Sequence, residues 1–515
     1  MTTTLKSYVC GQWFTGTGTM AQLYNPTTEE VVAQTSTKGI NFQEALEHAR
    51  NKGGKALREM TFAQRGELLM AMSKAIHEYR EELLDLAALN GGNTRGDGKF
   101  DIDGATGTLA YYAKLGEKLG DRKTLNDGDE IRLTKNPRWV GRHVYKPLHG
   151  VAILINAFNF PAWGFAEKAA TAILGGMPII NKPATSTSLV AARIAEILVE
   201  SGVIPEGVFS SICGSAGDML EHVQWQDVVA FTGSSDTGLK IRSMKSILEN
   251  NVRVNVEADS LNAAVLGPKV DSDDDVYDLF LREVVRDMTQ KAGQKCTGVR
   301  RIFVEESMVE GVVEDLKEQL AAMKVGAPTI KGVKTGPLAN AQQLQDAQAG
   351  LARLAECTET ACGGSRGDLE GIDSDKGYFL TPTLLVAKDA NSPELHDREI
   401  FGPVATVIPY DGSVEHASAL LEKGRGSLVS SVYSDKPAFL LAMADSASAY
   451  LGRMHLANSK IAEHSVGPGT VLPQLMHGGP GRAGGGQELG GMSGLHFYMQ
   501  RTAIQGFSPL LEKLN

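Results

Sequence analysis

The first part of the chain has a helical pattern of apolar positions. Between Thr61 and Leu89, apolar side chains recur every three or four residues, and the pattern ends at the Asn90-Gly91-Gly92 sequence. This spacing predicts an amphipathic helix that ends at the glycines. In residues 131–135 and 141–146, apolar and polar side chains alternate instead, which is typical of the two strands of an exposed hairpin.

From residue 147 onward, short apolar runs alternate with helical patterns. The runs occupy residues 151–155, 178–181, 208–212, 228–231 and 252–256. The helical patterns occupy residues 166–174, 188–201 and 219–223. This alternation predicts a parallel sheet covered by helices on both faces, and a second region of the same kind extends from about residue 262 to 432. Because ligands bind such sheets beyond the carboxyl ends of the strands, we expect functional residues in the loops after the runs.

One cysteine lies in a segment of small and polar residues, Lys291-Ala-Gly-Gln-Lys-Cys296-Thr-Gly298. A cysteine that only fills a core is usually surrounded by apolar residues. Gly293 and Gly298 allow the close approach of backbone and ligand. The positive charges of Lys291 and Lys295 are expected to favour the thiolate form. The segment therefore makes Cys296 a candidate nucleophile, with a buried structural cysteine as the alternative.

Polar side chains follow several of the expected strands. Asn159 could donate its amide to a developing oxyanion, although a loop asparagine is more often a turn residue. Lys182 could hold ribose hydroxyls or phosphate, or be a solvated lysine. Residues 232–238, at the start of an expected helix, form either an anion site or an ordinary N-cap. Glu257, after the last run, is a candidate general base, with a surface glutamate as the alternative.

The composition excludes several classes of function. The chain has 515 residues, 42% of them hydrophobic and 22% charged, which is the length of two or three globular domains. Its net charge of −10 argues against nucleic acid as a partner. The N-terminus lacks a signal-peptide pattern and the longest apolar stretch is too short for a membrane span, so we expect no membrane association. The spacing of the five cysteines indicates a reducing cytoplasm and no metal site.

Residues 479–484 formally match the G-x-G-x-x-G pattern of dinucleotide-binding loops. They follow no convincing strand and open no expected helix, so they lack the context that this motif requires. We therefore interpret the glycine-rich segment (478–486) as a loop near a site or an interface rather than as a cofactor loop.

Taken together, the motifs resemble the aldehyde dehydrogenase superfamily over nearly the whole chain. Their order and spacing are specific in combination: Asn159-Phe-Pro161, Lys182-Pro-Ala184, Phe231-Thr-Gly-Ser234, Glu257, Gly293-Gln-Lys-Cys296, Glu399-Ile-Phe-Gly-Pro403 and Glu488-Leu-Gly-Gly. The resemblance implies the α/β fold of that family. Its parts would be a Rossmann-like cofactor domain (1–130 and 147–258), an α/β catalytic domain (259–480) and a small β oligomerisation element (131–146 and 495–515).

The resemblance also implies a role for each catalytic candidate. Cys296 would attack the aldehyde carbonyl to form a thiohemiacetal, and the Asn159 amide and the backbone N–H of Cys296 would hold its oxyanion. After hydride transfer to the nicotinamide, Glu257 would activate water to hydrolyse the thioester. Glu399 and Phe401 would position the nicotinamide ribose and ring.

A set of residues is likewise implied for the dinucleotide, with Lys182 and Ser234 at its ribose and pyrophosphate. The full set comprises Ile155, Asn156, Ala157, Phe158, Lys182, Ala184, Thr185, Gly214, Gly217, Phe231, Thr232, Gly233, Ser234, Thr237, Glu399 and Phe401. NAD-preferring relatives often have a glutamate at the position of Thr185, where a carboxylate would repel a 2′-phosphate. We therefore predict NADP as the cofactor, with NAD as the alternative.

One segment departs from the family pattern. The usual Glu-Leu-Gly-Gly-Lys is replaced by Glu257-Ala-Asp-Ser-Leu-Asn262. The glutamate is retained, which favours hydrolysis over the CoA-acylating alternative, in which CoA resolves the thioester. A non-catalytic binding protein of the family is disfavoured because Cys296, Asn159 and Glu257 are all present.

A narrower resemblance involves residues 182–188, 477–486 and 498–501. They are similar to dehydrogenases of the aerobic CoA-dependent degradation of benzoate and phenylacetate. Because no hydratase-like segment follows, we expect the benzoate-pathway substrate, 3,4-dehydroadipyl-CoA semialdehyde, with the phenylacetate-pathway CoA semialdehyde or another small semialdehyde as alternatives. The glycine-rich segment would provide a wide mouth for the CoA thioester. The family pattern also implies a homodimer, or alternatively a tetramer, assembled through the hairpin and the C-terminal tail.

Overall fold

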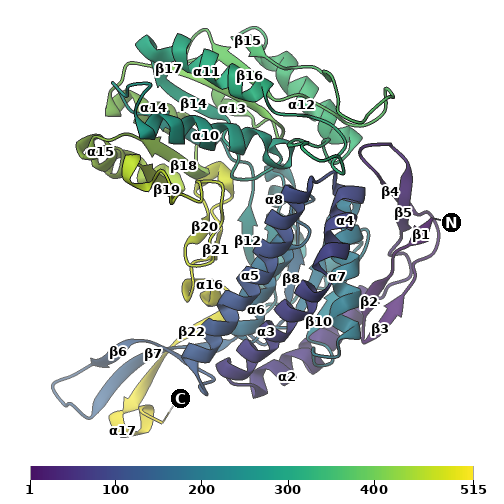
Figure 1. The fold of residues 1–515 in the computed structure, drawn as a ribbon. Helices are drawn as coiled ribbons and strands as arrows, with labels where there is room; N and C mark the ends of the chain where they lie inside the picture. The colour runs from purple at the N-terminus through teal and green to yellow at the C-terminus, as the bar shows by residue number, and fades with distance from the viewer. Residues whose placement is uncertain (1, 514–515) are drawn as a thin grey trace.

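The structure is a computed structural model that describes residues 2–513. Two seven-stranded sheets, each flanked by helices, form the bulk of the chain, and a three-stranded sheet extends away from them (Figure 1). A further small sheet near the N-terminus contains β1 (Thr3–Thr4), β5 (Val31–Thr35) and β4 (Ala21–Tyr24). Within residues 2–513, none of the helices combines the length and the apolar character needed to cross a membrane. The α/β class expected from the sequence is confirmed.

The first large sheet has the strand order β12-β11-β8-β9-β10-β2-β3. Its parallel strands are β8 (Ala152–Ile155), β9 (Ile179–Lys182), β10 (Phe209–Ser211), β11 (Val228–Thr232) and β12 (Arg253–Glu257). Each begins and ends within one residue of the apolar run that predicts it. The antiparallel edge consists of β2 (Ser7–Val9) and β3 (Gln12–Phe14). Because β9 and β11 flank β8, the strand order reverses there, and ligands of such sheets bind at this switch point.

Helices cover both faces of this sheet. They are α1 (Phe42–His48), α2 (Gly54–Glu59), α3 (Phe62–Glu78), α4 (Arg80–Gly91), α5 (Arg95–Leu119), α6 (Trp163–Gly175), α7 (Ser188–Glu200), α8 (Ser235–Arg242) and α9 (Lys245–Asn250). The single helix expected between residues 61 and 89 is instead two helices, because the backbone leaves helical geometry at Tyr79 (φ −99°, ψ 19°). Thr61 begins the first of them, where Thr61 and Gln64 form a reciprocal capping box.

The second large sheet has the order β15-β16-β17-β14-β13-β18-β19. Its strands are β13 (Ala263–Leu266), β14 (Arg301–Glu305), β15 (Thr358–Cys362), β16 (Thr383–Ala387), β17 (Val404–Tyr410), β18 (Ser427–Tyr433) and β19 (Leu451–Ala457). Its helices are α10 (Asp275–Thr289), α11 (Val309–Ala321), α12 (Ala341–Leu354), α13 (Glu394–Asp397), α14 (Val414–Lys423) and α15 (Pro437–Ala447). The expected second α/β region is present, and it extends beyond residue 432 because β19 adds a further parallel strand.

The chain ends by returning to the first sheet. The returning segment contains β20 (Met476–Gly478), β21 (Gln487–Leu489), α16 (Ser493–His496), β22 (Met499–Phe507) and α17 (Ser508–Leu511). β22 pairs with β7 (Trp139–Pro147), which pairs with β6 (Leu125–Arg132). The first hairpin strand therefore begins at Leu125 and not at residue 131 as expected. Most of its side chains are exposed, so no alternation of apolar residues marks its start.

A buried ion pair links the helical N-terminal region to the first sheet. The guanidinium of Arg50 donates to both carboxylate oxygens of Asp227, with N–O distances of 3.0 and 2.5 Å. Asp227 also accepts the backbone N–H groups of Val151 and Gln224 at 2.9 and 2.7 Å. These bonds fix the starts of β8 and β11, whose opposite ends carry candidate functional residues.

Asp227→Ala should destabilise the fold by about 3–5 kcal/mol, because Arg50 would keep a buried charge without a partner. Thermal unfolding followed by circular dichroism should show a lower midpoint. The control is Asp103→Ala, which breaks a more exposed pair with Arg80 and should cost at most about 1 kcal/mol. Equal shifts of the two midpoints would contradict this prediction.

Candidate active site

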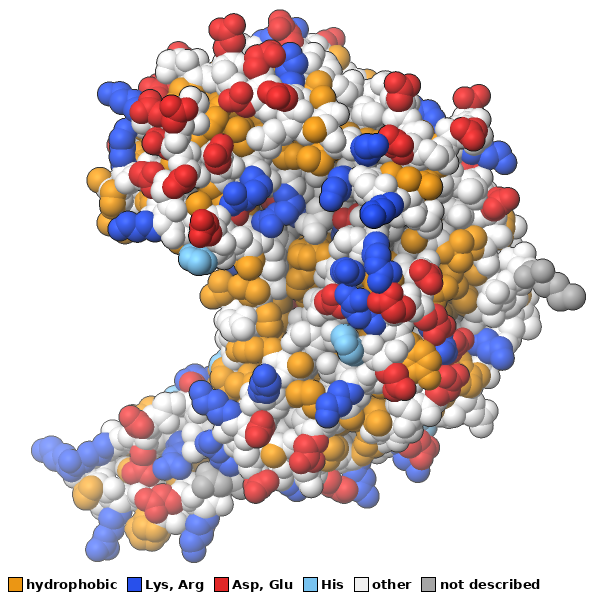
Figure 2. Space-filling view, in the orientation of Figure 1, with side chains coloured by type: hydrophobic (Ala, Val, Ile, Leu, Met, Phe, Trp, Pro, Cys, Tyr) orange, Lys and Arg blue, Asp and Glu red, His pale blue; other side chains and the backbone are white. Residues whose placement is uncertain are grey.

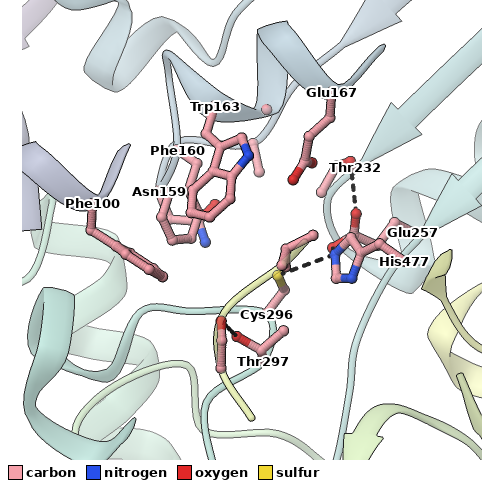
Figure 3. Close-up of a pocket in the computed structure, with 14 residues that line it drawn as sticks. Phe100, Asn159, Phe160, Trp163, Glu167, Thr232, Glu257, Cys296, Thr297 and His477 are labelled. Atoms are coloured by element: carbon pink, nitrogen blue, oxygen red, sulfur yellow. Dashed lines mark hydrogen bonds and ion pairs between the residues drawn. The ribbon is translucent and has the colours of Figure 1, made fainter. Parts of the chain in front are cut away.

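A cavity between the two large sheets collects the candidate catalytic residues. It is lined by Phe100, Ala157, Asn159, Phe160, Trp163, Gly164, Glu167, Thr232, Glu257, Cys296, Thr297, Gly469, Val471 and His477. These residues come from α5, the loop after β8, α6, the ends of β11 and β12, the loop after α10 and the C-terminal segment. The side chains of Asn159, Glu257 and Cys296, which are far apart in the sequence, therefore face one space (Figure 3).

Cys296 follows a tight backbone turn at the end of α10. Residues 291–293 have positive φ values of 54°, 51° and 68°, in a region that only glycine adopts at little cost. The side-chain amide of Asn262 donates to the backbone oxygens of Cys296 and Gly298, both at 2.8 Å. The segment in which the chain departs from the family pattern thus provides an anchor for the cysteine loop.

Gly293 also lies directly against the backbone of another loop. A Cβ at this position would lie 2.2 Å from the carbonyl oxygen of Gly402, so the site has no room for a side chain. Glycine is required here by both conformation and packing. The contact fixes the cysteine loop against the loop that carries Glu399 and Phe401.

The two lysines near Cys296 are directed to other partners. The ammonium group of Lys295 lies 2.6 Å from a carboxylate oxygen of Asp287. That of Lys291 lies over the ring of Phe160, 4.6 Å from its centroid. Burial, reinforced by nearby carboxylates, raises the pKa of the Cys296 thiol well above its usual value. The expectation that these lysines favour the thiolate is therefore wrong.

An imidazole lies between the thiol and a carboxylate. Nε2 of His477 lies 3.7 Å from Sγ of Cys296 and 3.1 Å from Oε1 of Glu257 (Figure 3). Burial opposes the charged form of each partner, but the attraction between Glu257 and His477 outweighs it. The pKa of Glu257 is lowered and that of His477 is raised, so the two form a carboxylate–imidazolium pair. The three ligand-type atoms lie within 4.8 Å of one another, a spacing that would also fit a metal ion.

More charged side chains lie behind Glu257. The ammonium group of Lys168 lies 3.2 Å from Glu488 and donates to the hydroxyl of Thr232 at 2.7 Å. That hydroxyl lies 3.4 Å from Oε2 of Glu257. Glu167 faces the cavity itself, and burial raises its pKa to about 8. The base candidate is thus part of an extended buried polar network.

Asn159 is held in place by the cysteine loop. Its Nδ2 donates to the backbone oxygen of Gln294 at 3.0 Å. An amide has two N–H groups, so this bond orients the side chain and leaves the second N–H for a ligand oxygen. Beside it, the rings of Phe100, Phe160 and Trp163 contact one another edge to face and form an apolar wall.

The residues expected at the cofactor lie mainly at the carboxyl end of the first large sheet. The end of β8 and the loop after it contain Ile155, Asn156, Ala157 and Phe158, and the end of β9 and the loop after it contain Lys182, Ala184 and Thr185. The loop after β10 contains Gly214 and Gly217. The segment that leads from β11 into α8 contains Phe231, Thr232, Gly233, Ser234 and Thr237. Some of these side chains bond within the protein. Asn156 donates to Asn181 at 2.7 Å, and Ser234 caps α8 by accepting the N–H of Thr237. Lys182 is largely buried, which lowers its pKa.

Glu399 and Phe401 approach this edge from the second sheet. Glu399 is buried, and its two oxygens accept from Nε of Arg300 at 2.9 Å and from the backbone N–H of Ser260 at 3.1 Å. Burial raises its pKa. The ring of Phe401 lies edge-on to that of Phe158, with 5.7 Å between centroids. The expected nicotinamide residues thus adjoin the loop after β8.

The glycine-rich segment packs against β12. The N–H of Gly486 donates to the carbonyl oxygen of Val256 at 3.1 Å, and a Cβ at Gly484 would lie 2.3 Å from the same oxygen. The segment therefore supports the strand that carries Glu257. Residues 478–486 line neither of the two pockets described beside Cys296, so these pockets do not support the expectation that the segment forms a wide mouth for a CoA thioester.

An open pocket continues outward from the cavity and shares three lining residues with it, Phe100, Trp163 and Val471. Its other lining residues are Gly96, Lys99, Asp103, Gly104, Gly107, Thr108, Tyr111, Gln290, Thr470, Leu472, Pro473 and Gln474. It therefore lies between α5 and the segment 470–474. The space-filling view in Figure 2 shows apolar side chains where the surface is hollowed between the two large lobes.

Several residues of the site lacked a predicted role. Glu167 and Lys168 interrupt an otherwise apolar helix, a local signal that could have identified them. Asn262 was visible only as a departure from the family pattern. His477 and Glu488 belong to recognised motifs, but no sequence pattern indicates that they contact Glu257 and Lys168.

Comparisons with known proteins place this site in a family. The aldehyde dehydrogenase family matches residues 13–504. The 3,4-dehydroadipyl-CoA semialdehyde dehydrogenase of Aromatoleum evansii is 42% identical over 479 residues, which cover 92% of this chain and 93% of that protein. The betaine aldehyde dehydrogenase of Staphylococcus aureus in complex with NAD⁺ has 25% identity and a TM-score of 0.83, covering 98% of this chain and 94% of that one.

The lactaldehyde dehydrogenase of Escherichia coli also has the same fold, with a TM-score of 0.84 at 24% identity and coverage of 98% and 99% of the two chains. The family match spans nearly the whole sequence and covers the second large sheet and all the parallel strands of the first. The chain therefore belongs to the aldehyde dehydrogenase family, whose members are NAD(P)-dependent oxidoreductases that act on aldehydes.

Proposed function

We propose that the protein oxidises an aldehyde to a carboxylic acid with NADP, through a thioester on Cys296. One observation carries the proposal. A thiol, an ionised carboxylate and an amide with an available N–H converge in one cavity beside the switch point of the first large sheet. This combination provides a nucleophile, a base and an oxyanion donor.

In the first half-reaction, the thiol of Cys296 loses its proton to the carboxylate of Glu257, Sγ forms a bond to the aldehyde carbon, and the carbonyl π pair moves to the oxygen. The second N–H of Asn159 and the backbone N–H of Cys296 stabilise that oxygen. A nicotinamide held beside Glu399 and Phe401 would supply the acceptor for the hydride, which leaves this carbon with the C–H electron pair. The carbonyl bond then re-forms, and the carbon is left as a thioester.

Before the second half-reaction, Glu257 releases the thiol proton to solvent. It then removes a proton from water while the water oxygen bonds to the thioester carbon. The carbon–sulfur bond then breaks, which releases the acid and the thiolate of Cys296. The ion pair with His477 keeps Glu257 ionised, as a base must be. A carboxylate 3.1 Å from the imidazole beside the thiol favours hydrolysis over the CoA-acylating alternative.

The loops at the carboxyl end of the first sheet fit a dinucleotide phosphate. The N-terminus of α8 offers backbone N–H groups and the Ser234 hydroxyl, which suit a pyrophosphate. Lys182 and Thr185 lie at and after the end of β9, where an ammonium and a hydroxyl suit ribose and phosphate oxygens. Because Thr185 stands where a carboxylate would repel a 2′-phosphate, we propose NADP in preference to NAD.

For the substrate, we propose 3,4-dehydroadipyl-CoA semialdehyde, an intermediate of benzoate degradation. The relative from Aromatoleum evansii carries this substrate in its name and matches 92% of the chain. The pockets support a long substrate, since the open outer pocket adjoins the cavity that contains the thiol, at Phe100 and Trp163. The phenylacetate-pathway CoA semialdehyde and other small semialdehydes are the alternatives.

We also propose a cytoplasmic homodimer, with a tetramer as the alternative. Apolar side chains are exposed on and beside the three-stranded sheet: Ile131, Leu133, Trp139, Phe507 and Leu510. A second copy of this surface would cover them. All five cysteines are unpaired, which suits a reducing compartment. The net charge of −10 disfavours nucleic acid as a partner.

Glu257→Gln should still allow a first turnover and should slow later turnovers at least about a hundredfold, because thioester hydrolysis requires the base. Stopped-flow absorbance of the reduced nicotinamide, with a semialdehyde substrate, should show a burst followed by a slow phase. The control Cys296→Ser should show no burst. A steady-state rate equal to that of the wild type would contradict the role of Glu257.

Thr185→Glu should shift the ratio of kcat/KM values from NADP toward NAD at least about tenfold, because the new carboxylate repels the 2′-phosphate. Thr185→Val is the matched variant, which should weaken NADP use without improving NAD use. Both ratios are measured at saturating aldehyde. A wild-type enzyme that prefers NAD would contradict the cofactor proposal.

A further inference from the structure

His477 contacts two reacting groups through one atom. Its Nε2 lies 3.7 Å from Sγ of Cys296 and 3.1 Å from Oε1 of Glu257 (Figure 3). Its other ring nitrogen, Nδ1, has no hydrogen-bond partner among residues 2–513. The polar contacts of the ring are therefore directed to the point where the thiol and the carboxylate meet.

The surrounding charges make the thiolate hard to form. The groups that face Cys296 and His477 are Glu257 on β12, Glu167 on α6, Glu399 before β17 and Arg453 on β19, with Lys168 behind Glu257. The negative charges of the carboxylates repel the negative charge of a Cys296 thiolate. The guanidinium of Arg453 donates to the backbone oxygens of Thr470 and Pro468, both at 3.1 Å. Within the described chain, His477 is the cationic group in contact with Sγ.

We propose that His477 is a catalytic residue that, as an imidazolium, stabilises the thiolate of Cys296 while the thiol proton passes to Glu257. The inference rests on the proposed function of Cys296 and Glu257. The S–H bond breaks, the proton bonds to a carboxylate oxygen of Glu257, and the electron pair stays on sulfur. His477 keeps its own proton throughout.

The charge balance explains why the imidazolium matters. Before the transfer, the positive ring is paired with the carboxylate of Glu257, and afterwards it is paired with the thiolate of Cys296. The buried cluster stays neutral overall, and its negative charge moves between two groups that lie beside the same nitrogen, Nε2 of His477. Without His477, the transfer would leave a buried negative sulfur with no cation in contact, which is costly.

An alternative is that His477 only orients Glu257 for hydrolysis. An orienting residue would affect the release of the thioester but not the reactivity of the free thiol. A residue that stabilises the thiolate would change thiol reactivity before any aldehyde is bound. Alkylation of Cys296 by iodoacetamide therefore separates the two roles.

The test measures the rate of alkylation from about pH 6 to about pH 10, in the full-length protein without aldehyde or cofactor. Mass spectrometry of the peptide that contains Cys296 follows the reaction. His477→Gln should lower the rate at least about tenfold at pH near 8, since one unit of thiol pKa changes the thiolate fraction tenfold. The exposed His464→Gln is the matched control and should react like the wild type.

His477→Asn provides a second replacement of the imidazole and keeps the proposal falsifiable if His477→Gln does not fold. It should slow alkylation in the same way, because it also removes the cation in contact with Sγ. Wild-type alkylation rates in a folded His477 variant would overturn the proposal.

Failure of this inference is distinguishable from failure of the proposed function. If Cys296→Ser still oxidised the aldehyde, the proposed function would fail. If the wild type showed a burst of reduced nicotinamide and Cys296→Ser did not, while His477→Gln alkylated normally, only the role of His477 would fail. We expect the burst rate of His477→Gln to fall at least about tenfold, in line with its lower thiolate fraction.

Discussion

The buried ion pair between Glu257 and His477 is the interaction around which the cavity is organised. Glu257 ends a strand of the first sheet, and His477 lies on the C-terminal segment that returns after the second sheet is complete. Two buried charges are tolerated only when they are paired, so the return of this segment is a condition for the cavity. The glycine-rich segment that follows His477 packs against the same strand and keeps the two partners in register.

Much of the fold could be predicted because the strands of the first sheet are continuous apolar runs. A parallel sheet brings the carboxyl ends of its strands to one edge, and the sequence places Asn159 and Glu257 after the ends of two such strands. The extra break at Tyr79 and the early start of the strand at Leu125 were not predicted, because both depend on backbone geometry or exposure that leaves no apolar pattern.

The remainder of the site depends on contacts between residues far apart in the sequence. Lys295 is next to Cys296 in the chain, yet its ammonium group is paired with Asp287. His477 is 181 residues from Cys296, yet its imidazole contacts the sulfur. Charge near a nucleophile therefore cannot be inferred from sequence neighbours, because the backbone turn directs neighbouring side chains to different partners.

The contact between Gly293 and the backbone of Gly402 limits how this site can diversify. Where two backbones touch directly, a shift of one loop cannot be compensated by replacing a side chain on the other loop, because neither loop has a side chain at the contact. The cysteine loop and the turn that contains Glu399 and Phe401 must therefore keep the same relative position when other parts of the site change. New substrates must be accommodated by the side chains of the outer pocket, on α5 and in residues 470–474, where substitution leaves the reacting atoms in place.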